Sequence, residues 1–84
     1  MKVTAKFVGA VKLLMNEERR AVTLKKGTVR ELLDSILRLH PEAKEKMKQV
    51  GVFIEGRLVK DAELDKSILK DGQDVSLILP VAGG

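Results

Sequence analysis

A single amphipathic helix is the strongest pattern in this sequence, and it limits what the rest of the chain can form. Thr28-Val29-Arg30-Glu31 has the T-x-x-E spacing of a capping box, in which the Thr28 hydroxyl accepts from the Glu31 N–H and the Glu31 side chain reaches back. Apolar residues then recur every three or four positions, at Val29, Leu32, Leu33, Ile36, Leu37 and Leu39. A helix with one apolar stripe must bury it against another element, and we expect that element to be a sheet.

Segments with the two-residue period of β-strands lie on both sides of the helix. Residues 2–8 alternate, with Val3, Ala5 and Phe7 on one side. The predicted strands cover residues 2–8, 20–25, 52–54, 57–60 and 74–79. Because the last strand follows all the predicted hairpins, we expect it to pair beside the first strand rather than at an edge. The predicted fold class is therefore α+β, with a four- or five-stranded mixed sheet and one main helix on one face.

The remaining segments are predicted to connect these elements. Residues 10–16 read as a moderately apolar connector, and Pro41 suits the first turn of a second short helix over residues 42–50. Gly51 is expected to end that helix in the left-handed conformation. The inward-facing residues of the short helix are predicted to be Ala43, Met47 and Val50. The residues expected in the main core are Leu32, Leu33, Ile36, Val3, Phe7, Val22, Val75 and Leu77.

The composition excludes several classes of function. The chain has no cysteine and a single histidine, His40, so we expect neither a bound metal nor a bound organic cofactor. Its 16 Lys and Arg and 12 Asp and Glu give a net charge of +4. These charges are interspersed and only Phe7 and Phe53 are aromatic, which argues against nucleic-acid binding. No apolar run approaches the roughly 18 residues of a membrane span. We therefore expect a cytoplasmic domain with no membrane partner and no enzymatic activity of its own.

The sequence ends Pro80-Val81-Ala82-Gly83-Gly84, directly after the last predicted strand. At about 7% glycine usage, a terminal Gly-Gly pair arises by chance in about one chain in two hundred. Because glycine has no Cβ atom, such a tail can pass through a narrow cleft and present the Gly84 carboxylate to a catalyst. Once activated, for example as an acyl-adenylate, that carboxylate can accept sulfur or an amine.

Several segments together resemble a known family. These segments are the opening strand with Phe7, Thr28-Val29-Arg30-Glu31-Leu32-Leu33, Glu55-Gly56-Arg57-Leu58-Val59, Asp71-Gly72-Gln73-Asp74-Val75-Ser76-Leu77 and the ending Leu79-Pro80-Val81-Ala82-Gly83-Gly84. The chain resembles the small subunit of molybdopterin synthase (MoaD) and its sulfur-carrier relatives such as ThiS, which are ubiquitin-like β-grasp proteins. The resemblance implies a β-grasp domain over residues 1–79 and a flexible Gly-Gly tail over residues 80–84.

The resemblance also implies a mechanism. A MoeB/ThiF-like adenylating enzyme uses ATP to convert the Gly84 carboxylate into an acyl-adenylate, and a sulfur donor turns this into a thiocarboxylate. The tail then enters the large subunit of molybdopterin synthase, a MoaE-like protein, and delivers sulfur to a pterin precursor. Gly84 is then the reacting residue, and Gly83 is needed for access. The residues implied to bind these partners are Val8, Leu58, Ile78, Pro80, Val81 and Ala82.

Strand alternation supports two residues of this binding surface. Val8 falls on the opposite side of its strand from Phe7, and Ile78 falls on the opposite side from Leu77. If the first and last strands are neighbours, Val8 and Ile78 meet on the face of the sheet that the helix does not cover.

Three functions remain open for the tail. The first is a sulfur carrier, for molybdopterin, thiamine or tRNA thiolation. The second is a ubiquitin-like modifier that forms isopeptide bonds between Gly84 and lysines. The third is a plain β-grasp interaction domain in which the Gly-Gly pair is incidental.

Overall fold

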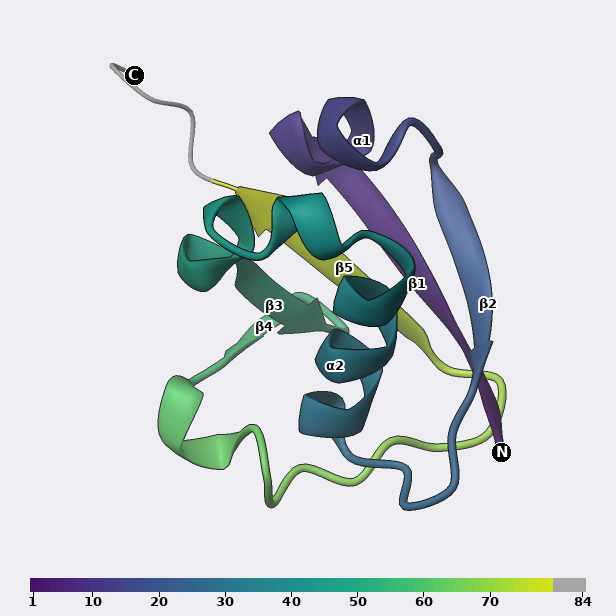
Figure 1. Ribbon diagram of the computed structural model, residues 1–84. Coiled ribbons are helices and arrows are strands. Elements are labelled where there is room, and N and C mark those ends of the chain that lie inside the picture. The colour runs from purple at the N-terminus through teal and green to yellow at the C-terminus, as the bar shows by residue number, and fades with distance from the viewer. Residues whose placement is uncertain (80–84) are drawn as a thin grey trace.

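The computed structural model describes residues 1–79, which form a five-stranded sheet with the main helix on one face (Figure 1). Along the chain the strands are β1 (Lys2–Gly9), β2 (Arg19–Thr23), β3 (Gly51–Ile54), β4 (Arg57–Val59) and β5 (Asp74–Leu79). Their order across the sheet is β2-β1-β5-β3-β4, with β1 and β5 parallel and the other neighbouring pairs antiparallel. The predicted fold class and the pairing of the last strand with the first are confirmed.

Helix α2 (Val29–Leu39) covers one face of this sheet and closes the core (Figure 1). The eight residues predicted for the main core are all buried: Val3, Phe7, Val22, Leu32, Leu33, Ile36, Val75 and Leu77. They come from the inward positions of β1, β2 and β5 and from the stripe of α2. The opposite side of the sheet, called the outer face below, carries the residues of the other parity.

A short helix, α1 (Ala10–Met15), replaces the connector predicted over residues 10–16. Gly9 takes a φ of 62° and turns the chain at the end of β1. Val11 and Met15, four residues apart, are buried on the same side of α1. The prediction missed this helix because six residues with two inward positions contain too little periodicity to distinguish a helix from an irregular connector.

The segment between α2 and β3 forms two 3-10 helices, η1 (Pro41–Ala43) and η2 (Lys46–Gln49), and a third, η3 (Asp61–Glu63), follows β4. The single helix predicted over residues 42–50 is therefore wrong. Its inward residues are better predicted, since Ala43 and Met47 are buried and Val50 is half-buried. Short 3-10 turns suit a stretch with so few inward positions. Within the described part of the chain, no helix is long and apolar enough to cross a membrane.

Thr28 caps α2 as predicted, because its Oγ1 accepts from the Glu31 N–H at 3.1 Å. The Glu31 side chain reaches back as predicted, but its carboxylate accepts from the loop before the helix and not from the Thr28 N–H of a capping box. Oε2 accepts from the Lys25 N–H at 2.8 Å, and Oε1 accepts from the N–H groups of Lys26 at 2.8 Å and Gly27 at 2.9 Å. Gly27 has a φ of 76°, and successive N–H groups in such a turn point to one centre.

Glu31→Gln is expected to reduce the acid sensitivity of the fold. The hydrogen bond from the Lys25 N–H, followed by those from Gly27 and Lys26, holds the pKa of Glu31 below its ordinary value. A carboxyl with a lowered pKa stabilises the fold above its unfolded pKa of about 4.3 and loses that contribution as the pH falls through the lowered value. Urea unfolding from about pH 5.5 to about pH 3 should therefore show a shallower decline in stability for Glu31→Gln than for wild type.

A matched control for this measurement is Glu45→Gln, which removes an exposed carboxylate 3.1 Å from Lys48 Nζ. Exposed pairs of this kind contribute little to stability, so we expect this variant to keep the wild-type decline. The same decline in both variants would contradict the role given to Glu31.

Candidate functional site

The tail that the sequence predicts to react follows the central strand of the sheet. β5 pairs with β1 on one side and with β3 on the other, and Leu79 is in register with Gly9. The predicted tail, residues 80–84, lies outside the described residues. This applies to each of its predicted site residues, namely Pro80, Val81, Ala82, Gly83 and Gly84. The end of β5 lies at the same end of the sheet as α1 (Figure 1).

Val8 and Ile78 lie side by side on the outer face at this end of the sheet, because they are register partners in the β1–β5 pair. Val8 is 41% exposed, and Ile78 is half-buried. The strand pairing explains why Val8 is more exposed than Ile78. The pairing of β1 with β2 stops at Lys6, so no β2 residue flanks Val8, whereas Ile78 has Val8 on one side and Gly51 on the other. Ile78 is therefore half-buried, whereas the predicted binding surface requires it to be exposed.

Leu58 belongs to the same face but does not lie next to Val8, because β3 and β5 separate their strands. It is 55% exposed and is in register with Phe53, which in turn is in register with Ser76. Phe53 therefore lies on the outer face between the strands of Leu58 and Ile78. We call the four apolar residues Val8, Ile78, Phe53 and Leu58 the outer patch.

Phe53 is the member of the outer patch that sequence reasoning missed. The run Val52-Phe53-Ile54 reads as a short buried strand, and three residues contain too few alternations to assign faces. The pairing of β3 with β5 decides which face each residue occupies. Val52 lies opposite the buried Leu77 and is itself buried, so its neighbour Phe53 faces outward. A signal was present at Gly51, since a residue without a side chain two positions before an aromatic leaves room for the ring on that face.

Gly51 leaves the space that the Phe53 ring occupies. The prediction that Gly51 ends a helix in the left-handed conformation is wrong, because it begins β3 and is not among the residues with positive φ. A Cβ atom built on Gly51 would lie 3.1 Å from Phe53 Cε1 and 3.9 Å from Leu58 Cδ1. Gly51 therefore shapes the outer patch through its missing side chain.

Gly51→Ala is expected to move the Phe53 ring without unfolding the protein. The ring is half-buried and can give way by a few tenths of an ångström, and alanine in a strand is more stable than glycine by roughly 0.5–1 kcal/mol. Urea unfolding should show equal or slightly higher stability, while NMR should show altered contacts between the Phe53 ring and the Leu58 methyl groups. A loss of more than about 1 kcal/mol would mean that the ring is fixed in place.

On the two central strands, β1 and β5, the outer face is polar away from Val8 and Ile78. Two residues before Val8 on β1, Lys6 Nζ lies 3.1 Å from Asp74 Oδ2. Ser76 separates Asp74 from Ile78 on the same face of β5. The outer face therefore changes from charged to apolar toward the end of β5, and its apolar end is suited to binding an apolar surface of another protein.

His40 has a structural role at the end of α2. Its Nε2 lies 3.2 Å from Glu17 Oε2, and its Nδ1 lies 3.4 Å from Glu42 Oε1. Partial burial raises the pKa of Glu17, but hydrogen bonds from Arg20 and His40 outweigh it and leave that pKa below its ordinary value. Among residues 1–79, no three His, Cys, Asp or Glu side chains are grouped so as to hold a metal ion.

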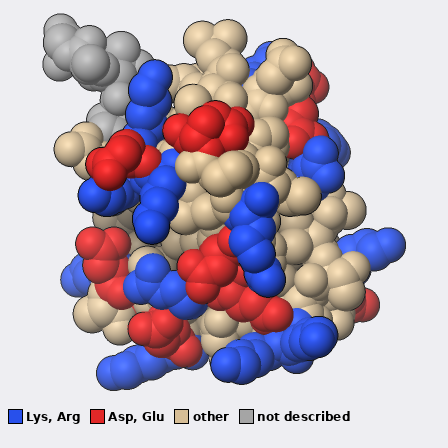
Figure 2. All heavy atoms as spheres, in the orientation of Figure 1, with Lys and Arg blue, Asp and Glu red and all other residues tan. Residues whose placement is uncertain are grey.

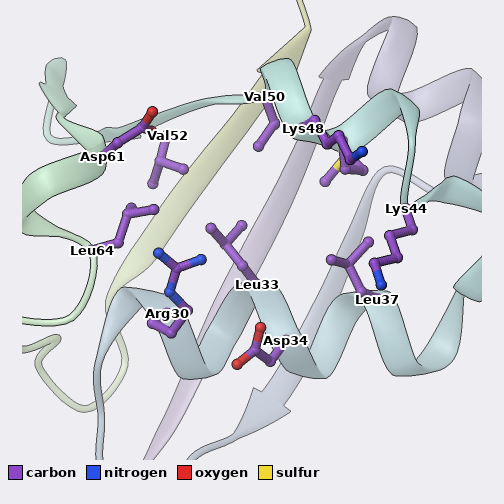
Figure 3. A pocket seen from close by; sticks show the side chains of 11 residues that line it. Arg30, Leu33, Asp34, Leu37, Lys44, Lys48, Val50, Val52, Asp61 and Leu64 are labelled. Atoms are coloured by element: carbon purple, nitrogen blue, oxygen red, sulfur yellow. The ribbon is translucent and has the colours of Figure 1, made fainter.

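A hollow lies on the helix side, between α2 and the segments that contain η2 and η3 (Figure 3). Apolar side chains, among them Leu33, Leu37 and Leu64, line it together with charged side chains such as Arg30 and Lys44. Figure 2 shows that basic and acidic residues are interspersed over this side of the molecule. None of the residues predicted for partner binding lines this hollow.

The chain matches a family of known proteins over nearly its whole length. The model of the ThiS family matches residues 5–84. None of the curated proteins compared with the chain matches it.

Solved structures agree with this family match. The putative molybdopterin converting factor subunit 1 from Pyrococcus furiosus is 28% identical with a TM-score of 0.80, over 96% of this chain and 99% of that one. Subunit 1 of the molybdopterin-converting factor from Helicobacter pylori 26695, solved in complex with subunit 2, is also 28% identical, with a TM-score of 0.70 over 100% of both chains. SAMP1 from Haloferax volcanii has a TM-score of 0.84 over 100% of both chains but is 18% identical, so it shows the shared fold alone.

Proposed function

The chain belongs to the ThiS family of small ubiquitin-like proteins, and from this we propose that it is a sulfur carrier that works through a thiocarboxylate at Gly84. The observation that carries the proposal is a ThiS-family β-grasp domain whose sequence continues from its central strand into Pro80-Val81-Ala82-Gly83-Gly84. In this proposal the chain supplies the reacting carboxyl group and partner enzymes supply the catalysis.

The chemistry proposed for Gly84 has three steps. An adenylating enzyme of the MoeB/ThiF kind uses ATP to form an acyl-adenylate on the Gly84 carboxylate and releases pyrophosphate. The outer sulfur of a donor persulfide then attacks the carbonyl carbon and AMP leaves, which forms an acyl disulfide. A second thiol attacks the donor-side sulfur of that disulfide, so that the thiocarboxylate leaves and the donor keeps a disulfide. ATP is thus a substrate of the partner, and the chain needs no cofactor of its own.

The fold supports this proposal by giving the tail a rigid origin. β5 is paired with β1 up to Leu79 and with β3 up to Ile78, so the segment that ends in the reactive carboxyl group begins at a fixed point. Five further residues span at most about 17 Å when extended, which is enough to reach into a partner while the domain stays outside. The outer patch lies at the same end of the sheet and would fix the domain against that partner.

We propose molybdopterin synthesis as the pathway and a MoaE-like large subunit as the acceptor. The two relatives at 28% identity support this choice, since both are described as subunit 1 of a molybdopterin-converting factor, and the Helicobacter pylori protein forms a complex with subunit 2. A gene for a large subunit next to the gene of this chain would support the same pathway.

Intact-protein mass spectrometry tests the proposal. The chain is incubated with its adenylating enzyme, ATP and a sulfur donor, and it should gain the mass difference between sulfur and oxygen at Gly84. Without ATP no gain is expected. If the chain instead becomes attached through Gly84 to lysine side chains, the modifier function is correct. If Gly84 stays unchanged when the enzyme is active on another carrier, both functions are wrong.

A further inference from the structure

A groove adjoins the outer patch on its polar side, and Phe53 belongs to both. The groove is lined by Lys6, Phe53, Glu55, Gln73, Asp74 and Ser76, with Gly56 at the hairpin turn. It runs between the β3–β4 hairpin and the start of β5. A partner that covers the outer patch would therefore also cover this groove.

The charges of the groove are unequally satisfied. Asp74 is paired, because its Oδ2 lies 3.1 Å from Lys6 Nζ. Glu55 is exposed, and among the described residues it takes part in no ion pair. Counting Lys6, Asp74 and Glu55, the groove carries one net negative charge on a protein whose net charge is +4. A cation is the ligand that complements this local charge.

The conformation of the β3–β4 turn gives no reason for a glutamate at position 55. Glu55 has a φ of 52° and Gly56 a φ of 78°, the conformation of a two-residue hairpin turn with both central residues left-handed. Asparagine, aspartate or glycine fits the first of these positions with less strain than glutamate. Glutamate there accepts strain and places a longer acidic side chain at the mouth of the groove.

We propose that this groove receives an arginine side chain of the adenylating enzyme that acts on Gly84, and this inference rests on the proposed function. A guanidinium group is planar, so it can stack against the Phe53 ring while it donates two hydrogen bonds to the Glu55 carboxylate. Asp74, already bound to Lys6, adds negative charge nearby. The outer patch supplies apolar contact, and the groove supplies orientation and selection against partners without the cation.

Binding measured by calorimetry between the full chain and the adenylating enzyme tests the proposal. Glu55→Arg places a cation where the partner's cation should sit, and we expect the affinity to fall at least about tenfold. Asp34→Arg is the matched control, because it changes the net charge equally on α2, on the other side of the sheet. We expect the control to stay within about twofold of wild type. Equal losses of affinity in both variants would mean that only the net charge of the protein matters, and this result would overturn the proposal for the groove.

Glu55→Asn separates binding from folding. Asparagine relieves strain at a left-handed position, so the melting temperature should be equal or higher, while affinity for the adenylating enzyme should fall. Unchanged affinity would overturn the proposal. The two proposals can fail separately. If wild type binds the enzyme and Glu55→Arg does not, the groove proposal is supported; if wild type then forms no thiocarboxylate, the sulfur-carrier function is wrong. If wild type itself does not bind the enzyme, the groove has no such occupant and the proposal is wrong.

Discussion

Gly83→Val is expected to abolish formation of the thiocarboxylate and leave the domain as stable as wild type. A β-branched side chain next to Gly84 cannot pass through a cleft shaped for glycine, and it restricts the backbone angles that the carboxylate needs to reach the ATP-bound centre. Misplacing a reacting group by an ångström costs about 100-fold in rate, so a loss of at least that size is expected. The measurement is the rate of adenylate and thiocarboxylate formation at saturating ATP, followed by mass spectrometry.

Two further variants complete this experiment. Ala82→Gly keeps the tail narrow and should react within a few-fold of wild type, which controls for a general effect of changing the tail. Thermal unfolding should give the same midpoint for all variants, because changes in a terminal segment seldom alter the core. If a chain that lacks Gly83 and Gly84 accepted sulfur as well as wild type, the carrier function would be excluded.

Ile78→Lys is expected to weaken binding to both the adenylating enzyme and the large-subunit partner by about 2 kcal/mol, or roughly 30-fold, which is typical of a central apolar anchor. Ile78 lies on the central strand, with Val8 and Gly51 as its register partners. The fold should survive, because the lysine stem can lie along the outer face while its ammonium group reaches water. The affinities are measured by titration calorimetry and the fold by circular dichroism.

Thr23→Lys is the matched control for this substitution. Thr23 is exposed on the outer face of the edge strand β2, where it is in register with Lys2, so the variant adds the same charge to the same face away from the outer patch. We expect its affinities to stay close to those of wild type. Equal weakening by Thr23→Lys and Ile78→Lys, or no weakening by Ile78→Lys, would remove the outer patch from the binding surface.

The sequence predicted those features that depend on neighbouring residues. The Thr28 cap is confirmed, and so is the stripe of α2 at its four buried positions, Val29, Leu32, Leu33 and Ile36, because each depends on residues within four positions of one another. The stripe is wrong at Leu39, which is 52% exposed at the last residue of the helix. Alternation along β1 and β5 likewise assigned Phe7 and Leu77 to the core. Where a segment is short, as in α1, the same reasoning has too few repeats to succeed.

By itself the sequence determined the fold class, the core and the Gly-Gly ending, because hydrophobic period, caps and turns are properties of local segments. The sequence placed the last strand beside the first, but only the tertiary structure decided the order of the other strands and the register of each pair. That register turned Phe53 outward beside Leu58 and gave Gly51 a role opposite to the predicted one. It also left Val8 more open than Ile78. The physical reason is that strand pairing joins residues far apart in the chain, and no local pattern records which distant backbone will supply the hydrogen bonds.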